Sequence, residues 1–234
     1  VYVGGDEHAV LHLLYTRFLT RALADLDLLD RREPVERLVT QGTVLYEGRK
    51  MSKSEGNAIA PHEYGAETTR LFVLSAAHPG QDFEWTVKDV GTAYDFLQTV
   101  YGLVTEFEDL DLRRESASHD AYLEREIDRT VAAVTDEFDR FRFHRVVSEL
   151  RRFVRLLRRY RDHDTPYAGA YSRGLRVLSL LIAPIAPYLG EELWAVLDGE
   201  GLAATARWPA PLQSVPDYGL ERALIEDTLA DVRD

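Results

Sequence analysis

The segment Lys50-Met51-Ser52-Lys53-Ser54 brings two ammonium groups and two hydroxyl groups together within five residues. A lysine side chain presents a compact positive charge that suits the oxygens of a phosphate group. Two lysines three positions apart can flank one polyphosphate and stabilise the charge that develops as pyrophosphate departs. Gly48 and Gly56 lie on either side and permit a loop that closes over a substrate. On charge alone, an exposed basic surface loop is the simpler interpretation.

The beginning of the chain, Gly4-Gly5-Asp6-Glu7-His8, forms a second candidate site. We expect a strand, a glycine turn and then the start of a helix. Glycines allow a nucleotide to approach the backbone closely, and a helix N-terminus offers free amide groups. A carboxylate at this place can accept hydrogen bonds from ribose hydroxyls. Alternatively, Asp6 and Glu7 only favour the helix dipole, and His8 is an ordinary buried histidine.

A third candidate is one face of a helix expected over residues 142–162. Its arginines recur at helical spacing, at Arg151, Arg155, Arg158 and Arg159. A basic stripe of this kind matches the phosphate backbone of a nucleic acid. The alternative is a solvated face whose arginines pair with the acids of a neighbouring helix.

The apolar pattern predicts the elements that must position these residues. In the first part we expect a strand and turn at 1–5, an amphipathic helix at 8–25, a strand at 38–46 interrupted by Gly42, a loop at 47–60, and helices from Pro61 and over 66–77. After a short connector, Thr86 is the expected N-cap of the next helix.

From there the chain is expected to be almost entirely helical. Helices are predicted over 87–108, 119–140, 142–162, 168–182 and 185–197, with a last one from about residue 218. Pro184 and Pro187 either kink one long helix or separate two helices. The predicted fold class is therefore an α/β piece followed by an all-α bundle.

Composition narrows the kinds of site that the protein can contain and the environment that it suits. The 234 residues contain no cysteine, which excludes disulfides and thiolate zinc sites, and we expect no metal site built by the protein alone. No apolar run is long enough to cross a bilayer. The lack of cysteine leaves the redox compartment undetermined, and a cytoplasmic location is the default expectation. The net charge of −12 with only three lysines favours a salt-rich, halophilic cytoplasm, while a GC-rich genome is the alternative. Because Lys50 and Lys53 are two of these three, the ammonium group itself is expected to matter there.

The five residues from Lys50 to Ser54 are identical to the KMSKS signature of class I aminoacyl-tRNA synthetases, and they also stand between a strand and a short helix. Residues 64–72 resemble the sequence that follows the signature in that family. Gly-Gly-Asp-Glu-His-Ala at 4–9, followed by His-Leu-Leu-Tyr at 12–15, resembles the leucyl form, as do residues 40–45 and 83–85. Residues 178–194 resemble the APxxPxxxEELW segment of the family's anticodon-binding bundle.

The resemblance to leucyl-tRNA synthetases implies a domain plan and a reaction. Residues 1–80 correspond to the C-terminal half of a Rossmann-like catalytic domain, 81–90 to a connector, 91–212 to a helical anticodon-binding domain and 213–234 to a linker. The implied reaction uses leucine, ATP with Mg²⁺, and tRNA(Leu). Leucine and ATP give leucyl-adenylate and pyrophosphate, and the leucyl group then passes to the 3′-terminal ribose of the tRNA.

The resemblance also implies roles for single residues. Lys50 and Lys53 would bind the phosphates, with Ser52 and Ser54 supporting the loop. Adenosine would contact the main chain near Val44 and Met51 and the residues Gly4, Gly5, Glu7 and His8, with Asp6 as a competing ribose ligand. The basic face at Arg151, Arg155, Arg158 and Arg159 would meet tRNA. Glu55 departs from the pattern, since the family usually has lysine there, and this puts full activity in doubt.

The resemblance does not cover a whole enzyme. The family's other signature, His-Ile-Gly-His or a variant, does not occur in this sequence. We therefore expect this chain alone not to activate leucine at a useful rate. Three interpretations stay open: a fragment of a synthetase, the smaller subunit of a split synthetase whose second chain carries the His-Ile-Gly-His half, or an inactive relic that binds tRNA or a protein.

Overall fold

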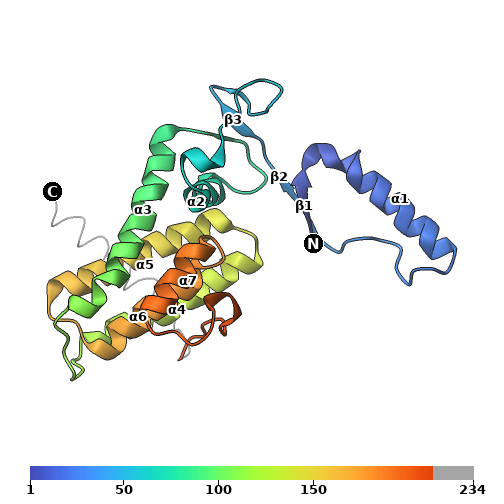
Figure 1. Cartoon of the computed structure of the whole chain (residues 1–234). Helices are drawn as coiled ribbons and strands as arrows, with labels where there is room; N and C mark the ends of the chain where they lie inside the picture. Colours follow the sequence, from blue (N-terminus) through green and yellow to red (C-terminus); the bar gives the residue numbers. More distant parts are fainter. Residues whose placement is uncertain (213–234) are drawn as a thin grey trace, which may run out of the picture.

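The computed structural model describes residues 1–212, so the linker expected at 213–234 and the helix expected near residue 218 lie outside the described residues. Five long helices form a bundle, and a small sheet with its loop projects from one end of it (Figure 1). A second small sheet and helix α1 extend to one side. The predicted class, an α/β part followed by an all-α part, is confirmed. No helix among these residues is both long and apolar enough to span a membrane.

The side arm is a strand–helix–strand unit. Strands β1 (Tyr2–Gly5) and β2 (Leu38–Gln41) pair in parallel, and α1 (His12–Asp25) connects them. The predicted helix start at residue 8 is wrong, because a short 3₁₀ turn at Asp6–Ala9 comes first and Leu11 has non-helical backbone angles.

The second sheet has the order β4-β3-β5, with β3 (Val44–Tyr46) in the centre, β4 (Arg49–Lys50) antiparallel to it and β5 (Phe83–Glu84) parallel to it. Glu47 and Gly48 between β3 and β4 both have left-handed backbone angles, at φ 51° and 71°, as a two-residue hairpin turn requires. The expected connector thus contains a strand, because Phe83 and Trp85 donate to main-chain oxygens of the β3 segment.

Gly42 divides the predicted strand at 38–46 between these two sheets. Its amide donates to the carbonyl of Pro79 at 2.7 Å. A Cβ atom at this position would lie 2.2 Å from the main chain of Gln81, so no larger residue fits without moving the backbone. Glycine is required here because two chain segments cross at close range.

The predicted helices of the bundle are all present, within a few residues of their expected ends. They are α3 (Val87–Thr105), α4 (Asp120–Asp139), α5 (Phe143–His163), α6 (Ala168–Ile182) and α7 (Pro187–Val196). Thr86 caps α3 by accepting the amide of Asp89, as expected. Pro184 and Pro187 separate two helices rather than kink one long helix, because α6 ends before Pro184 and α7 begins with Pro187.

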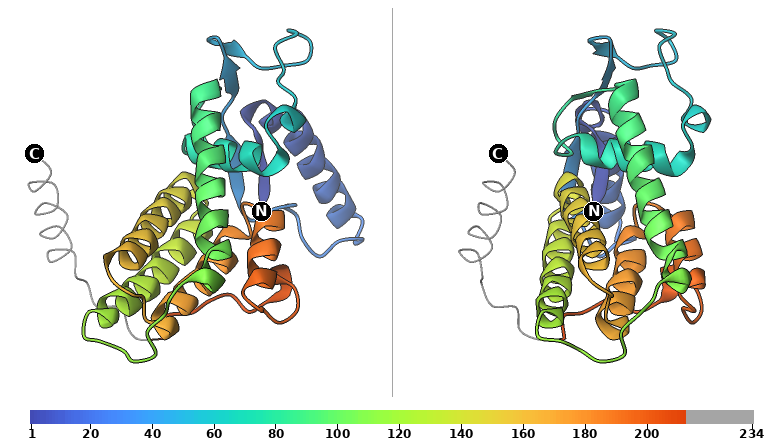
Figure 2. Two further views of the ribbon diagram at one scale, coloured as in Figure 1. Left: turned by 60° about the vertical axis from the view of Figure 1, so that its left-hand side comes forward. Right: turned by 90° about the vertical axis from the view of Figure 1, so that its left-hand side faces the viewer.

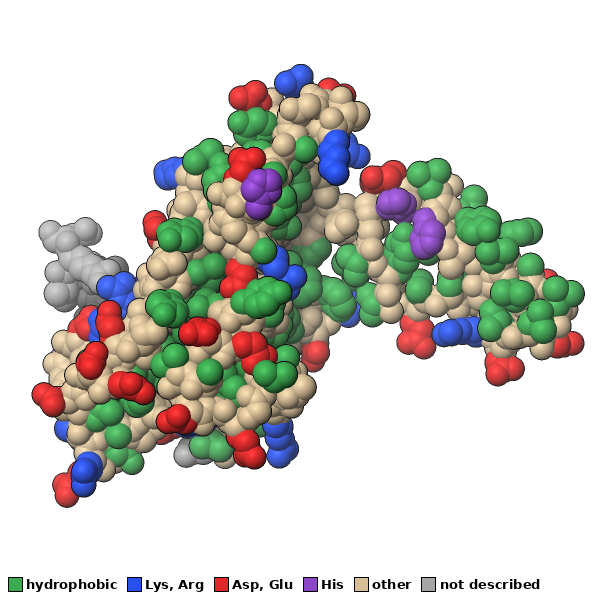
Figure 3. All heavy atoms as spheres, in the orientation of Figure 1, with side chains coloured by type: hydrophobic (Ala, Val, Ile, Leu, Met, Phe, Trp, Pro, Cys, Tyr) green, Lys and Arg blue, Asp and Glu red, His purple; other side chains and the backbone are tan. Residues whose placement is uncertain are grey.

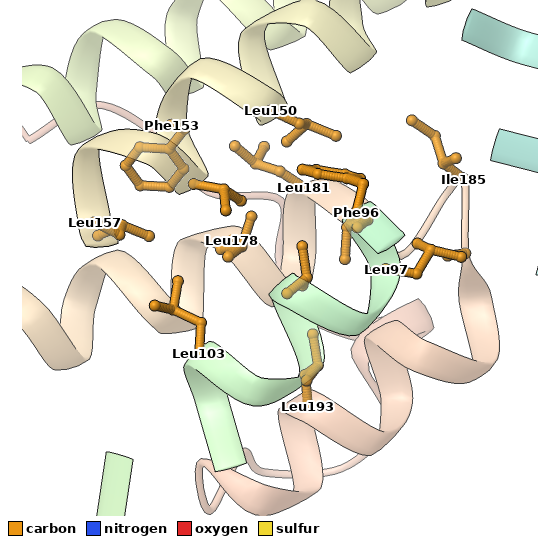
Figure 4. Packing of buried hydrophobic residues seen from close by; sticks show 14 of the residues in the cluster. Phe96, Leu97, Leu103, Leu150, Phe153, Leu157, Leu178, Leu181, Ile185 and Leu193 are labelled. Atoms are coloured by element: carbon orange, nitrogen blue, oxygen red, sulfur yellow. The ribbon is translucent and has the colours of Figure 1, made fainter. Parts of the chain in front are cut away.

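One apolar core joins the helix bundle to α2 (Ala66–Ala76) and to the β4-β3-β5 sheet. Figure 4 shows buried side chains that come from α3, α5, α6 and α7, among them Phe96, Phe153 and Leu181. Helix α2 (Ala66–Ala76), preceded by a 3₁₀ turn at Pro61–Glu63, lies across one end of the long helices (Figure 2) and adds Leu71 and Phe72 to the same core. The two parts of the chain therefore pack as one unit at α2.

Helix α1 does not share this core. Its apolar side chains are largely exposed, at 59% for Leu14, 62% for Tyr15 and 68% for Phe18. Figure 3 shows hydrophobic side chains along this arm. The spacing correctly predicted an apolar helix face, but nothing among residues 1–212 covers it.

A buried carboxylate fixes the start of α4. Asp120 is 1% exposed and accepts hydrogen bonds from the Ala117 amide at 2.6 Å, the Tyr160 hydroxyl at 2.6 Å and the Arg113 guanidinium at 2.9 Å. Burial by itself would raise the pKa of Asp120, but these three donors outweigh it and lower the pKa to about 2. The carboxylate therefore ties α4 to α5 in its charged form.

Candidate nucleotide site and basic face

The signature segment begins on a strand and continues as a loop. Lys50 lies in β4, opposite Leu45, so its expected position within a loop is wrong. The Met51 amide donates to the Val44 carbonyl at 2.8 Å and extends the hairpin. These two main-chain groups, which were expected near adenine, are thus already bonded to each other. The main chain at Lys50 is fixed by the sheet, and the loop proper runs from Met51 to Ala60.

Asn57 closes this loop. Its side-chain oxygen accepts the Ser52 amide at 2.8 Å, and its side-chain nitrogen donates to the Lys50 carbonyl at 3.1 Å. The Ser52 hydroxyl lies 3.0 Å from the Ser54 hydroxyl and accepts the Glu55 amide at 3.2 Å, so both serines support the loop internally. Sequence reasoning gave Asn57 no role, although an asparagine in a loop commonly binds nearby backbone in this way.

The structure brings the two sequence-predicted sites together at Lys50. Its ammonium nitrogen lies 3.6 Å from a carboxylate oxygen of Glu7, and both side chains are exposed. The backbone amide of Glu7 and then the Lys50 charge lower the pKa of Glu7. Lys53 is exposed as well. A phosphate group close to Lys50 would meet the positive charge of this side chain beside the carboxyl end of β1.

Glycines shape the end of β1. A Cβ atom on Gly5 would lie 2.3 Å from a carboxylate oxygen of Glu7, so glycine lets that carboxylate fold back over the strand. Asp6 and Glu7 are exposed, whereas His8 is half-buried with Nδ1 lacking a hydrogen-bond partner among the described residues. Gly4 and Gly5 do not lie directly at the N-terminus of α1, because the 3₁₀ turn at Asp6–Ala9 comes between them and the helix. The site is instead the region outside the carboxyl ends of two parallel strands, where α/β proteins bind nucleotides.

On α5 the predicted basic face divides into two kinds of arginine. Arg155, Arg158 and Arg159 are exposed and have no ion-pair partner within residues 1–212. Arg151 is half-buried, and its guanidinium lies 4.9 Å from the centre of the Phe96 ring. Burial, and then the charge of Arg155, lowers the pKa of Arg151. The exposed three can meet a polyanion, while Arg151 also contributes to packing.

Several other arginines on α4 and α5 and in the turn between them follow the alternative interpretation, because they pair with acids. Arg152 contacts Glu126 at 2.5 Å and Glu149 at 3.1 Å, and Arg129 contacts the same two carboxylates at 3.2 and 3.1 Å. Further pairs join Arg142 to Glu137, Arg140 to Asp136 and Arg161 to Glu106. No group of three or more metal-binding side chains occurs among the described residues.

Two family models match the chain. The model for class I tRNA synthetases (I, L, M and V) matches residues 15–86, and the model for the anticodon-binding domain of tRNA ligases matches residues 120–234. The first range includes the signature loop and the second includes the basic face.

Curated relatives are leucine–tRNA ligases. The one from Halobacterium salinarum is 46% identical over 245 aligned residues that span all of this chain and 27% of the relative. Those from Geotalea daltonii and Solibacter usitatus are 38% and 36% identical, and each alignment spans 89% of this chain. The chain thus spans about a quarter of the length of the relatives it matches, 27% and 26% for these two.

A solved structure has the same fold. The LeuRS of Agrobacterium radiobacter, in a ternary complex with tRNA and LeuAMS, superimposes with a TM-score of 0.80 at 31% identity and covers 92% of this chain and 29% of that one. The motifs, both family models and these relatives agree. The chain belongs to the class I tRNA synthetase family, and the relatives that it matches there are leucine–tRNA ligases.

Proposed function

We propose that this chain supplies the phosphate-binding loop and the tRNA-binding bundle of a leucine–tRNA ligase, which activates leucine with ATP and transfers it to tRNA(Leu). The observation that carries the proposal is the meeting of the signature loop and the glycine segment, with Lys50 and Glu7 3.6 Å apart. The leucine–tRNA ligase relatives support leucine as the amino acid.

In this proposal the chain acts through position and charge. Gly4 and Gly5 admit adenosine at the end of β1, His8 and Asp6 border it, and the Lys53 ammonium stabilises the departing pyrophosphate. Before ATP binds, Glu7 is the partner of Lys50. A phosphate oxygen would replace it, which frees the Glu7 carboxylate to accept a ribose hydroxyl.

Mg²⁺ supplies charge neutralisation of the phosphates when it is bound. Because the described residues form no cluster of three metal-binding side chains, ATP itself would hold the ion and bring it to the site.

The exposed arginines of α5 are the proposed contacts to the tRNA phosphates, because they lack acidic partners in the described part of an otherwise acidic protein. We keep the division into a catalytic part at 1–80, a connector at 81–90 and a bundle from residue 91. As this reaction belongs to protein synthesis, we place it in the cytoplasm.

Amino-acid-dependent exchange between ATP and pyrophosphate tests the proposal. The full-length protein that contains this sequence should catalyse exchange with leucine and far more slowly with isoleucine or valine. Exchange led by another amino acid would refute the leucine assignment. Tight tRNA binding without any exchange would favour an inactive, synthetase-derived tRNA-binding protein. Glu55 is consistent with that function, because it places a negative charge next to the signature, where the family usually has lysine.

A further inference from the structure

Helix α7 begins without a capping side chain of its own. Ala186 is its N-cap and Pro187 its first residue, and neither offers an acceptor for the free amides of the first turn. The carboxylate of Glu67 on α2 takes this role. It accepts the Tyr188 amide at 2.5 Å and the Leu189 amide at 3.1 and 3.2 Å, although Glu67 lies 121 residues before Tyr188 in the chain.

Arg70, one turn further along α2, holds the linker that precedes α7. Its guanidinium donates to the carbonyl oxygen of Ile185 at 2.9 Å and to that of Pro184 at 3.0 Å. Ile185 is fully buried in the core, so the linker has little freedom to move. Two opposite charges three residues apart on α2 thus match the positive end of α7 and the carbonyls of its linker.

The same helix holds the end of the signature loop. The Thr69 hydroxyl reaches the Pro61 carbonyl at 3.5 Å, and Pro61 follows the last loop residue directly. Leu71 and Phe72, further along α2, are buried in the core. Helix α2 is therefore a rigid piece with the loop at one end and the bundle clamped to its side (Figure 2).

We propose that Glu67 and Arg70 are positioning residues, which set the tRNA-binding bundle against the phosphate-binding loop and so place the 3′ end of bound tRNA at the adenylate. The inference rests on the proposed function. Within this chain, adenylate formation uses the signature loop and the glycine segment, and tRNA binding uses the bundle, but transfer needs the loop and the bundle in register. A misplacement of about 1 Å can slow such a step by up to about a hundredfold.

The test uses the full-length protein with Glu67→Ala, Glu67→Gln and Arg70→Ala. Glu192→Gln is the matched control, because Glu192 is an exposed carboxylate on α7 itself. We expect exchange without tRNA and the Kd for tRNA to change by less than about threefold, while single-turnover transfer slows by roughly tenfold or more. The control should change none of the three.

A second variant separates positioning from simple capping. In the Glu67→Ala background, Ala186→Ser gives α7 a local cap without restoring the link to α2. We expect the Tm to recover and transfer to stay slow. Recovery of both would show that Glu67 only stabilises the helix and would overturn the proposal. If this double variant does not fold, the Glu67→Gln and Arg70→Ala rates decide the question.

Failure of the inference differs from failure of the proposed function. If exchange, tRNA binding and transfer all fall by the same factor in the variants, the residues are only structural. If the unmodified protein transfers no leucine to tRNA(Leu), the proposed function is refuted and the inference with it.

Discussion

Triple replacement of Arg155, Arg158 and Arg159 by alanine should weaken tRNA binding in a salt-dependent way. These side chains are exposed and have no ion-pair partner in the described part of the chain, so they are available to bind phosphates. Each lost phosphate contact lowers the slope of log affinity against log salt by roughly 0.7 to 0.9. Three contacts give a change of about 2 to 3.

The size of the expected difference in tRNA affinity follows from this change in slope. Between about 0.05 and 0.2 M salt, the unmodified protein should lose roughly 20- to 40-fold more tRNA affinity than the triple variant. Filter binding or fluorescence anisotropy with tRNA(Leu) measures this, with circular dichroism to check that each protein is folded at every salt concentration.

Two paired arginines provide controls. Arg140→Ala removes an exposed arginine whose partner is Asp136, and Arg152→Ala removes a largely buried one that lies between Glu126 and Glu149. Arg140→Ala should leave the slope unchanged. Arg152→Ala should lower the Tm, because Glu126 and Glu149 each lose one of two arginine partners and keep only Arg129 among the described residues, and it should not lower the slope. An unchanged slope in the triple variant, or an equal loss in either control, would refute the reasoning.

Three other changes test separate parts of the structure. Gly42→Ala should lower the Tm by several degrees, at about 2 to 4 °C per kcal/mol, because its Cβ would meet the Gln81 backbone at 2.2 Å; an unchanged melting curve would contradict this close approach. Asn57→Ala should slow leucine-dependent exchange roughly 10- to 30-fold by removing two loop hydrogen bonds, with tRNA affinity unaltered. Because the folded pKa of Asp120 is about 2, its contribution of about 2 kcal/mol is present above pH 4 and lost as the pH falls towards 2. Urea unfolding should show that Asp120→Asn lacks this part of the acid sensitivity, and equal sensitivity would count against the buried network.

The long helices were predictable because their apolar residues repeat over many turns. This periodicity, together with Thr86 and the two prolines, located all five bundle helices. The signature loop was predictable for another reason, since its residue string is specific. Strand β5 was missed because two residues carry no period, and its pairing depends on β3, about forty residues earlier.

The contacts between distant segments could not be read from local patterns. The approach of Lys50 to Glu7 depends on how two sheets are placed, and the capping of α7 by Glu67 joins residues 121 positions apart. Helical spacing put Arg151 and Arg155 on one face, but only the packing of α3 against α5 shows that Arg151 lies over Phe96. For α1, spacing predicts an apolar face without indicating what covers it.

The proposed function depends most on Lys53 acting on the phosphates of ATP in a leucine-activating site. Leucine-dependent exchange between ATP and pyrophosphate tests it most directly, measured at high salt in the full-length protein with Lys53→Ala and with Lys88→Ala as the control for loss of a lysine. We expect a decrease of at least about a hundredfold for Lys53→Ala, with an unchanged fold, and normal exchange for Lys88→Ala. Near-normal exchange in Lys53→Ala would contradict it.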